Sequence, residues 1–62
     1  MPVVTIQMYA GRTKQQKAEL AKAITEAVVR IALTTPEQTW VVFQDVPRDS
    51  WAIGGVLASD RP

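Results

Sequence analysis

The chain has 62 residues, with 7 Lys and Arg against 6 Asp and Glu, a formal net charge of +1, and neither Cys nor His. This length leaves room for one domain, expected over residues 1–62, because typical domains contain about 100–150 residues. The missing Cys and His exclude disulfides, thiolate metal sites, most catalytic metal sites and imidazole triads. We therefore expect no metal and no cofactor, and the balanced charge offers no electrostatic basis for binding nucleic acid or a membrane surface.

A domain this small buries only about 60% of its unfolded surface, so that it is usually reinforced by disulfides, a metal or self-association. Only self-association remains for this composition, and the apolar fraction of 47% favours it. The longest uncharged stretch, residues 2–11, is too short to span a bilayer. With no pattern typical of a signal peptide, we expect a cytoplasmic protein.

The first predicted element is a strand over residues 3–9, which are rich in β-branched side chains. A two-residue period places Val4, Ile6 and Met8 on one face of this strand and Val3, Thr5, Gln7 and Tyr9 on the other. The following Ala-Gly-Arg segment, residues 10–12, breaks the strand, because Gly11 can adopt a positive φ.

A helix is predicted next, over residues 14–33. Thr13 and Gln16 match a capping box, in which each side chain bonds the backbone N–H of the other residue. The helix should end near residues 34–36, because a proline disfavours the helical conformation in the residue before it. Its apolar side chains recur at spacings of three and four and form one stripe: Leu20, Ile24, Ala27, Val28 and Ile31.

A second strand is predicted over residues 39–46, apolar on both faces. Strand, helix and strand form a β-α-β unit with parallel strands, and a C-terminal hairpin follows, with Gly54-Gly55 as its turn. The fold class is therefore α+β (α/β). Since one helix covers only one face of a two-stranded sheet, we expect identical subunits to cover the remaining face and the strand edges.

The second residue is the least usual candidate for chemistry. Initiator Met1 is normally removed before a small residue, and the mature chain would then begin with Pro2, a secondary amine. Desolvation and nearby cations would both lower the pKa of this amine, so that its neutral form could act as a general base near pH 7. On composition alone, a structural role of Pro2 at the start of the strand is the simpler interpretation.

The ordered motifs resemble the 4-oxalocrotonate tautomerase family over almost the whole chain. They are Pro2 before an apolar strand, residues 11–13 (Gly-Arg-Thr), residues 41–43 (Val-Val-Phe) and residues 51–55 (Trp-Ala-Ile-Gly-Gly). The resemblance implies a β-α-β subunit, sheets joined across a dimer, and commonly a trimer of dimers. It also implies that Pro2 is a catalytic base in a keto–enol isomerase (tautomerase), that Arg12 binds a substrate carboxylate, and that Trp51 forms an aromatic wall.

One position departs from the family pattern. Members of the family carry a second arginine in the second strand, which helps to polarise the substrate, and the matching residue here is Trp40. An indole donates one hydrogen bond and carries no charge, so that Trp40 is either a substrate contact or an aromatic in a subunit interface. Arg48 lies just before Trp51 and could partly compensate, although an exposed turn arginine is the simpler interpretation.

The length of the first strand predicts how the site is assembled. Pro2 and Tyr9 are seven steps apart, or about 23 Å in an extended strand, so that Pro2 and Arg12 of one chain cannot hold the same small substrate. If first strands pair antiparallel across a two-fold axis, Arg12 reaches Pro2 of the neighbouring subunit. We expect a dimer or hexamer that binds a small carboxylate.

Two alternatives remain open at this point. A protonated Pro2 could act as an acid in hydration, dehalogenation or decarboxylation, for which Asp45 and Asp49 are the nearby carboxylates, although each is more simply a solvated surface charge. The chain could also be a non-catalytic oligomeric module, an interpretation that the replacement of the second arginine favours.

Overall fold

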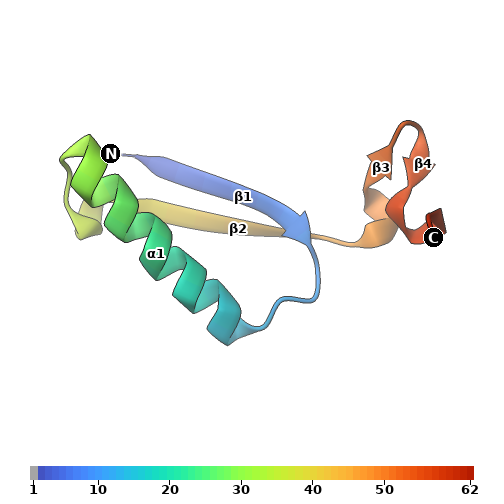
Figure 1. Ribbon diagram of the computed structural model, residues 1–62, viewed down its shortest axis with the longest axis horizontal. Coiled ribbons are helices and arrows are strands. Elements are labelled where there is room, and N and C mark those ends of the chain that lie inside the picture. Colours follow the sequence, from blue (N-terminus) through green and yellow to red (C-terminus); the bar gives the residue numbers. More distant parts are fainter. Residues whose placement is uncertain (1) are drawn as a thin grey trace.

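The computed structural model describes residues 2–62, in which two long strands lie side by side and one helix crosses them. Strand β1 (Val3–Tyr9) pairs in parallel with β2 (Trp40–Val46), and α1 (Lys14–Ala32) connects them (Figure 1). A hairpin of β3 (Ala52–Ile53) and β4 (Val56–Leu57) follows. The predicted β-α-β unit with a C-terminal hairpin is confirmed, whereas the expected removal of Met1 lies outside the described residues.

The start of α1 has the predicted capping box. The backbone N–H of Gln16 donates to Thr13 Oγ1 over 3.1 Å, and the backbone N–H of Thr13 donates to Gln16 Oε1 over 3.0 Å. The helix ends at Ala32, slightly earlier than predicted, because Leu33 adopts a left-handed conformation with φ 55°. The chain therefore leaves the helix before it reaches the proline at residue 36, which begins the short 3-10 helix η1 (Pro36–Gln38).

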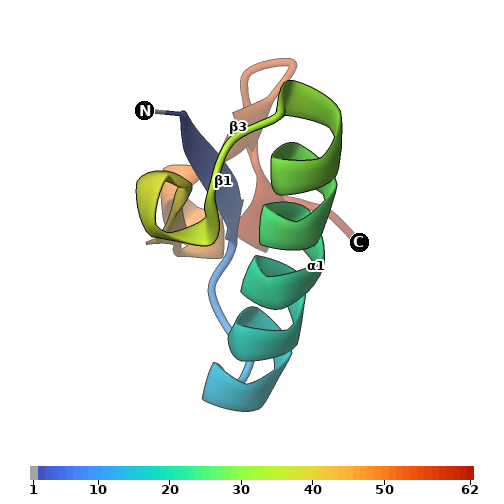
Figure 2. The same cartoon turned by 90° about the vertical axis from the view of Figure 1, so that its left-hand side faces the viewer.

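The strand register gives the sheet two different faces. Val3 pairs with Trp40 and Tyr9 with Val46, so that the two strands run in step from end to end. Figure 2 shows α1 on one side of the strands only. The face toward the helix is half-buried along most of its length, whereas the opposite face exposes a row of side chains: Val3, Thr5, Gln7, Trp40, Val42 and Gln44.

The hairpin extends beyond the strand pair at the end opposite to Pro2 (Figure 1). Gly54 (φ 61°) and Gly55 (φ 83°) form its turn, as predicted, and both positive angles favour glycine. The backbone N–H of Ala58 donates to Trp51 O over 2.7 Å, and this hydrogen bond closes the base of the hairpin. The 3-10 helix η2 (Arg48–Ser50) precedes the hairpin, and the 3-10 helix η3 (Ala58–Asp60) follows the hairpin.

The single chain is open and extended. Its radius of gyration is 14.6 Å, whereas a compact chain of this length has a radius of about 10.6 Å. Its accessible surface is 4816 Å², compared with about 3,950 Å² for a compact monomer of this mass. Ala58 is the only apolar residue of those described that is buried, and no large side chain is fully enclosed. Among residues 2–62, no helix is long and apolar enough to cross a membrane.

Candidate active site

Pro2 and Trp40 lie together at the amino end of the sheet. The backbone N–H of Trp40 donates to the carbonyl oxygen of Pro2 over 3.0 Å, so that the first residue of β2 holds the residue before β1. Pro2 is half-buried. The Trp40 side chain, in contrast, is 52% exposed on the helix-free face, and an indole of this size is available for a further contact.

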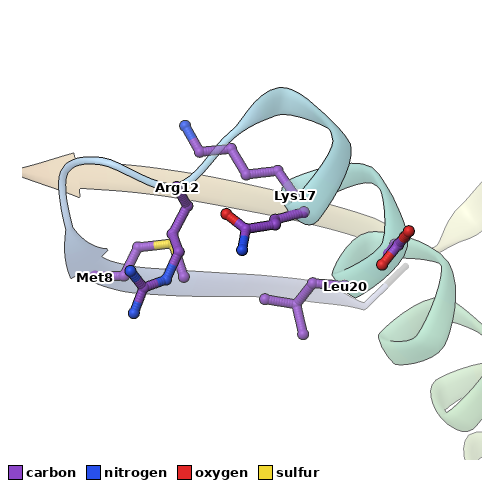
Figure 3. A pocket seen from close by; sticks show the side chains of 6 residues that line it. Met8, Arg12, Lys17 and Leu20 are labelled. Atoms are coloured by element: carbon purple, nitrogen blue, oxygen red, sulfur yellow. The ribbon is translucent and has the colours of Figure 1, made fainter.

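Arg12 lies at the other end of β1, at the mouth of a cavity. The cavity has a volume of about 380 Å³ and lies between the end of β1 and the first turns of α1. Figure 3 shows Met8 and Arg12 next to each other there, with Leu20 projecting from the helix. Arg12 is exposed and has no ion pair among residues 2–62. The lining of this cavity therefore combines the apolar side chains of Met8 and Leu20 with the guanidinium of Arg12, and the carboxylate of Glu19 also borders it.

A neighbouring cation is already neutralised. Lys17, from the first turns of α1, forms an ion pair with Asp45, near the end of β2. Asp45 lies on the helix-facing side of the sheet, where the long Lys17 side chain reaches it, and its carboxylate remains exposed, as expected for a surface charge. Because Asp45 holds Lys17, Arg12 is the cation in this cavity without an acidic partner among the described residues.

Three side chains form a stacked cluster at the same end of the sheet. The rings of Tyr9 and Trp51 meet edge to face, with centroids 4.9 Å apart and planes at 66°. The guanidinium carbon of Arg48 lies 4.4 Å from the centre of the Tyr9 ring. A second hollow of about 310 Å³ lies beside this cluster, bordered by Trp51, Ser50 and the hydrogen-bonded amides of Gln7 and Gln44.

The four residues predicted for the site thus fall into two groups. Pro2 and Trp40 lie at the amino end of the strands, whereas Arg12 and Trp51 lie beyond their carboxyl ends. The length of β1 separates the two groups by about 23 Å. The structure of one chain therefore does not bring the proposed base and the proposed carboxylate ligand together.

Tyr9 is the residue that reasoning from the sequence did not connect to the site. The parallel register pairs Tyr9 with Val46 and so places the start of the turn after β2 beside the end of β1, which no local sequence pattern indicates. The backbone N–H of Ala10 donates to Val46 O over 3.0 Å and extends this pairing beyond the strands. Within residues 2–62, no three acidic side chains come together in a way that could hold a metal ion.

Comparisons with known proteins identify relatives of this chain in both sequence and fold. The family model described as "Tautomerase enzyme" matches residues 2–61. A probable tautomerase from Bacillus cereus is 40% identical over 62 residues, covering 98% of this chain and all of that protein. The crystal structure of a 4-oxalocrotonate tautomerase homologue superposes with a TM-score of 0.92 at 37% identity, covering 100% of this chain and 98% of the other.

A further solved structure is that of a heterohexamer 4-oxalocrotonate tautomerase from Chloroflexus aurantiacus. It superposes with a TM-score of 0.90 at 32% identity, and the match covers 97% of each chain. The resemblance carried by Pro2, Arg12 and the segment at residues 51–55 thus extends over nearly the whole sequence and the whole fold. The chain belongs to the tautomerase family.

Proposed function

We propose that the protein is a cofactor-independent tautomerase that interconverts the enol and keto forms of a small unsaturated 2-hydroxy or 2-oxo acid. Pro2 is the general base, Arg12 binds the carboxylate, and Trp51 and Trp40 are substrate-binding aromatics. The observation that carries this proposal is the division of the candidate residues between the two ends of β1. The amino end carries the proposed base, Pro2, and the carboxyl end carries the proposed carboxylate ligand, Arg12.

Self-association would bring Pro2 of one subunit close to Arg12 of another. β1 and β2 form a two-stranded sheet, so that β1 keeps one edge without a strand partner among the described residues. If two β1 edges pair antiparallel about a two-fold axis, Pro2 of one subunit approaches Arg12 of the other. The accessible surface exceeds that of a compact monomer by about 900 Å², which is close to the roughly 800 Å² that each partner contributes to a stable interface. A dimer or hexamer fits this requirement.

The proton transfer then proceeds within one substrate molecule. Arg12 binds the carboxylate with its fork of N–H donors. The neutral amine of Pro2 takes the proton of the enol hydroxyl, and the O–H electron pair forms the carbonyl while the C=C electrons move to carbon. The protonated Pro2 returns the same proton to that carbon. Atoms and charge balance, and no oxidant or second substrate is needed.

The aromatic side chains support this chemistry by excluding water. Trp51 is half-buried against Tyr9 beside the carboxyl ends of the strands. A wall of this kind makes ionisation of the neighbouring amine less favourable, which lowers its pKa and keeps it neutral near pH 7. Asp45, one of the two carboxylates considered for the activation of water, is engaged by Lys17, and this contact disfavours Asp45 in that role.

The test compares the native chain with Pro2→Ala on a panel of enols. Both chains begin with a small residue after Met1, so that intact mass should show the same removal of Met1 in both. General base catalysis is typically worth about 10²–10⁴-fold. The alanine that replaces Pro2 would still offer a primary amine, so that we expect kcat/KM to fall by roughly 10- to 100-fold, at or below the lower limit of that range.

The pH dependence of kcat/KM distinguishes Pro2 acting as a base from Pro2 acting as an acid. A general base works in its neutral form, so that kcat/KM should increase as the pH rises through the pKa of the amine. A protonated Pro2 acting as an acid would give the opposite dependence. Retention of Met1 would make the Pro2 nitrogen a tertiary amide, and either this finding or full activity of Pro2→Ala would contradict the proposal.

A further inference from the structure

The cavity at the start of α1 is lined by two side chains of opposite charge that have no ion pair among residues 2–62. Arg12 borders the cavity beyond the end of β1, and Glu19 borders it from the second turn of the helix. Lys17 also lines the cavity, but its ammonium group is paired with Asp45. The lining therefore presents one free cation and one free anion.

A single carboxylate is enough to neutralise the free cation. In the proposed function Arg12 binds this carboxylate with its fork of N–H donors. Gln16, the remaining polar residue of the lining, is neutral. Lys22 follows Glu19 by one helical turn, but it does not line the cavity and has no ion pair with a described residue. Once the first carboxylate is bound, the charge that this lining presents to the rest of the substrate is the anion of Glu19.

The size of the cavity keeps the whole of a bound substrate within the field of Glu19. A sphere with the cavity volume of about 380 Å³ is about 9 Å across, close to the Debye length of about 8–10 Å in ordinary salt. Glu19 is exposed, so that water weakens its field. Two like charges about 8 Å apart, at an effective dielectric constant of about 40, still change an equilibrium constant about 6-fold. This repulsion is large enough to measure as a preference between substrates.

We propose that Glu19 is a specificity-determining residue that restricts the substrate to a single carboxylate. The rest of the substrate is uncharged and lies along Met8 and Leu20, whose apolar side chains offer a second carboxylate no hydrogen bond (Figure 3). This inference rests on the proposed function, because it takes the cavity beside Arg12 as the place where the substrate carboxylate binds. It adds a limit on the charge of the substrate, which neither Pro2 nor Arg12 sets.

The experiment measures kcat/KM for two enols that differ only at the far end, a 2-hydroxydienoate with one carboxylate and the 2-hydroxydienedioate with two. Both share the carboxylate that Arg12 binds, so that the ratio of their kcat/KM values isolates the second charge. Native protein should favour the monocarboxylate. Glu19→Gln should raise the relative kcat/KM of the dicarboxylate by about 3- to 10-fold, mainly through KM. This difference should become smaller at high salt, because ions screen the repulsion.

Three further variants separate charge from packing. Glu19→Asp keeps the carboxylate and should keep the native ratio, whereas Glu19→Lys should favour the dicarboxylate more than Glu19→Gln does. Glu26→Gln removes the same charge from an exposed position of α1 seven residues later, about 10.5 Å along the helix, and should leave the ratio nearly unchanged. Glu and Gln have similar helix propensities, so that circular dichroism should show the same helix content in Glu19→Gln and native protein.

The two proposals fail in different ways. A ratio that is equal in native protein and Glu19→Gln, or a native preference for the dicarboxylate, would overturn the role of Glu19. The proposed function fails if native protein converts neither enol, or if Pro2→Ala converts both at the native rate. A protein that depends on Pro2 but converts both enols equally well contradicts only the role of Glu19.

Discussion

Lys17 and Asp45 form an ion pair that joins the first turns of α1 to the end of β2. The first turn of α1 contains no acidic residue of its own, although the amino end of a helix favours negative charge. The contact that Asp45 makes, from the neighbouring strand, is with the Lys17 side chain. The pair thereby holds the helix over the carboxyl end of the sheet, where Arg12 and its cavity lie.

We expect Asp45→Asn to lower the free energy of unfolding only slightly. The two side chains are 27% and 41% exposed, and solvent screening limits such pairs to under about 1 kcal/mol. Chemical denaturation at a constant chain concentration, at low and at high salt, measures this contribution, with Asp60→Asn as the control. High salt should reduce the difference between native protein and Asp45→Asn, and a larger loss in high salt would contradict a screened surface pair.

The capping box makes a second stability prediction. Thr13→Ala removes the acceptor for the Gln16 N–H and should lower the free energy of unfolding by about 1 kcal/mol. Thr13→Ser keeps a hydroxyl and should retain most of the stability. Thermal or urea denaturation checks both variants at the same chain concentration, because self-association contributes to the measured stability. Equal stability of Thr13→Ala and native protein would mean that water accepts the hydrogen bond of the Gln16 N–H as favourably as the Thr13 hydroxyl does.

Shared sites predict complementation between two inactive variants. A dimer that pairs a Pro2→Ala chain with an Arg12→Ala chain contains one site with both native residues and one with neither. Random mixing of the two chains should therefore restore about a quarter of native activity. Activity is measured after the chains are unfolded and refolded together, and mass spectrometry verifies that mixed oligomers form. No recovery in verified mixed oligomers would count against a site shared in this way.

The helix-free face of the sheet should be a contact between subunits. Val42 is 46% exposed there, in a row with Val3 and Trp40. Val42→Asp places a charge in this apolar row and should shift the protein toward smaller species in sedimentation velocity. Ala23→Asp, at an exposed position of α1, is the control and should leave the distribution unchanged. If both variants sediment like the native protein, this face is not buried by self-association.

Much of the fold follows from local patterns that the sequence displays directly. The period of two in residues 3–9, the capping box at Thr13 and Gln16, and the Gly54-Gly55 turn each depend on neighbouring residues. The end of α1 was less predictable. The stop at Ala32 depends on the left-handed conformation of Leu33, which the following proline does not require.

Part of the candidate site could also be named from the sequence. Pro2, Arg12, Trp40 and Trp51 stand at positions that family motifs identify. Their division between the two ends of β1 was expected from the length of an extended strand, and the structure agrees with that expectation. The clustering of Tyr9, Arg48 and Trp51 was not predicted, because it joins residues that are far apart in the chain and depends on the parallel register.

The sequence by itself determined the order of the elements, because periodicity, capping and turn residues are properties of short segments, whereas the candidate base Pro2 came from the resemblance to a family. Only the tertiary structure decided which charged side chains contact another side chain. The packing of α1 on the sheet brings Lys17 to Asp45, and the register of β1 with β2 brings Arg48 to Tyr9. The reason is physical: an ion pair or a stacked guanidinium depends on distances across the sheet, which no single segment of the chain contains.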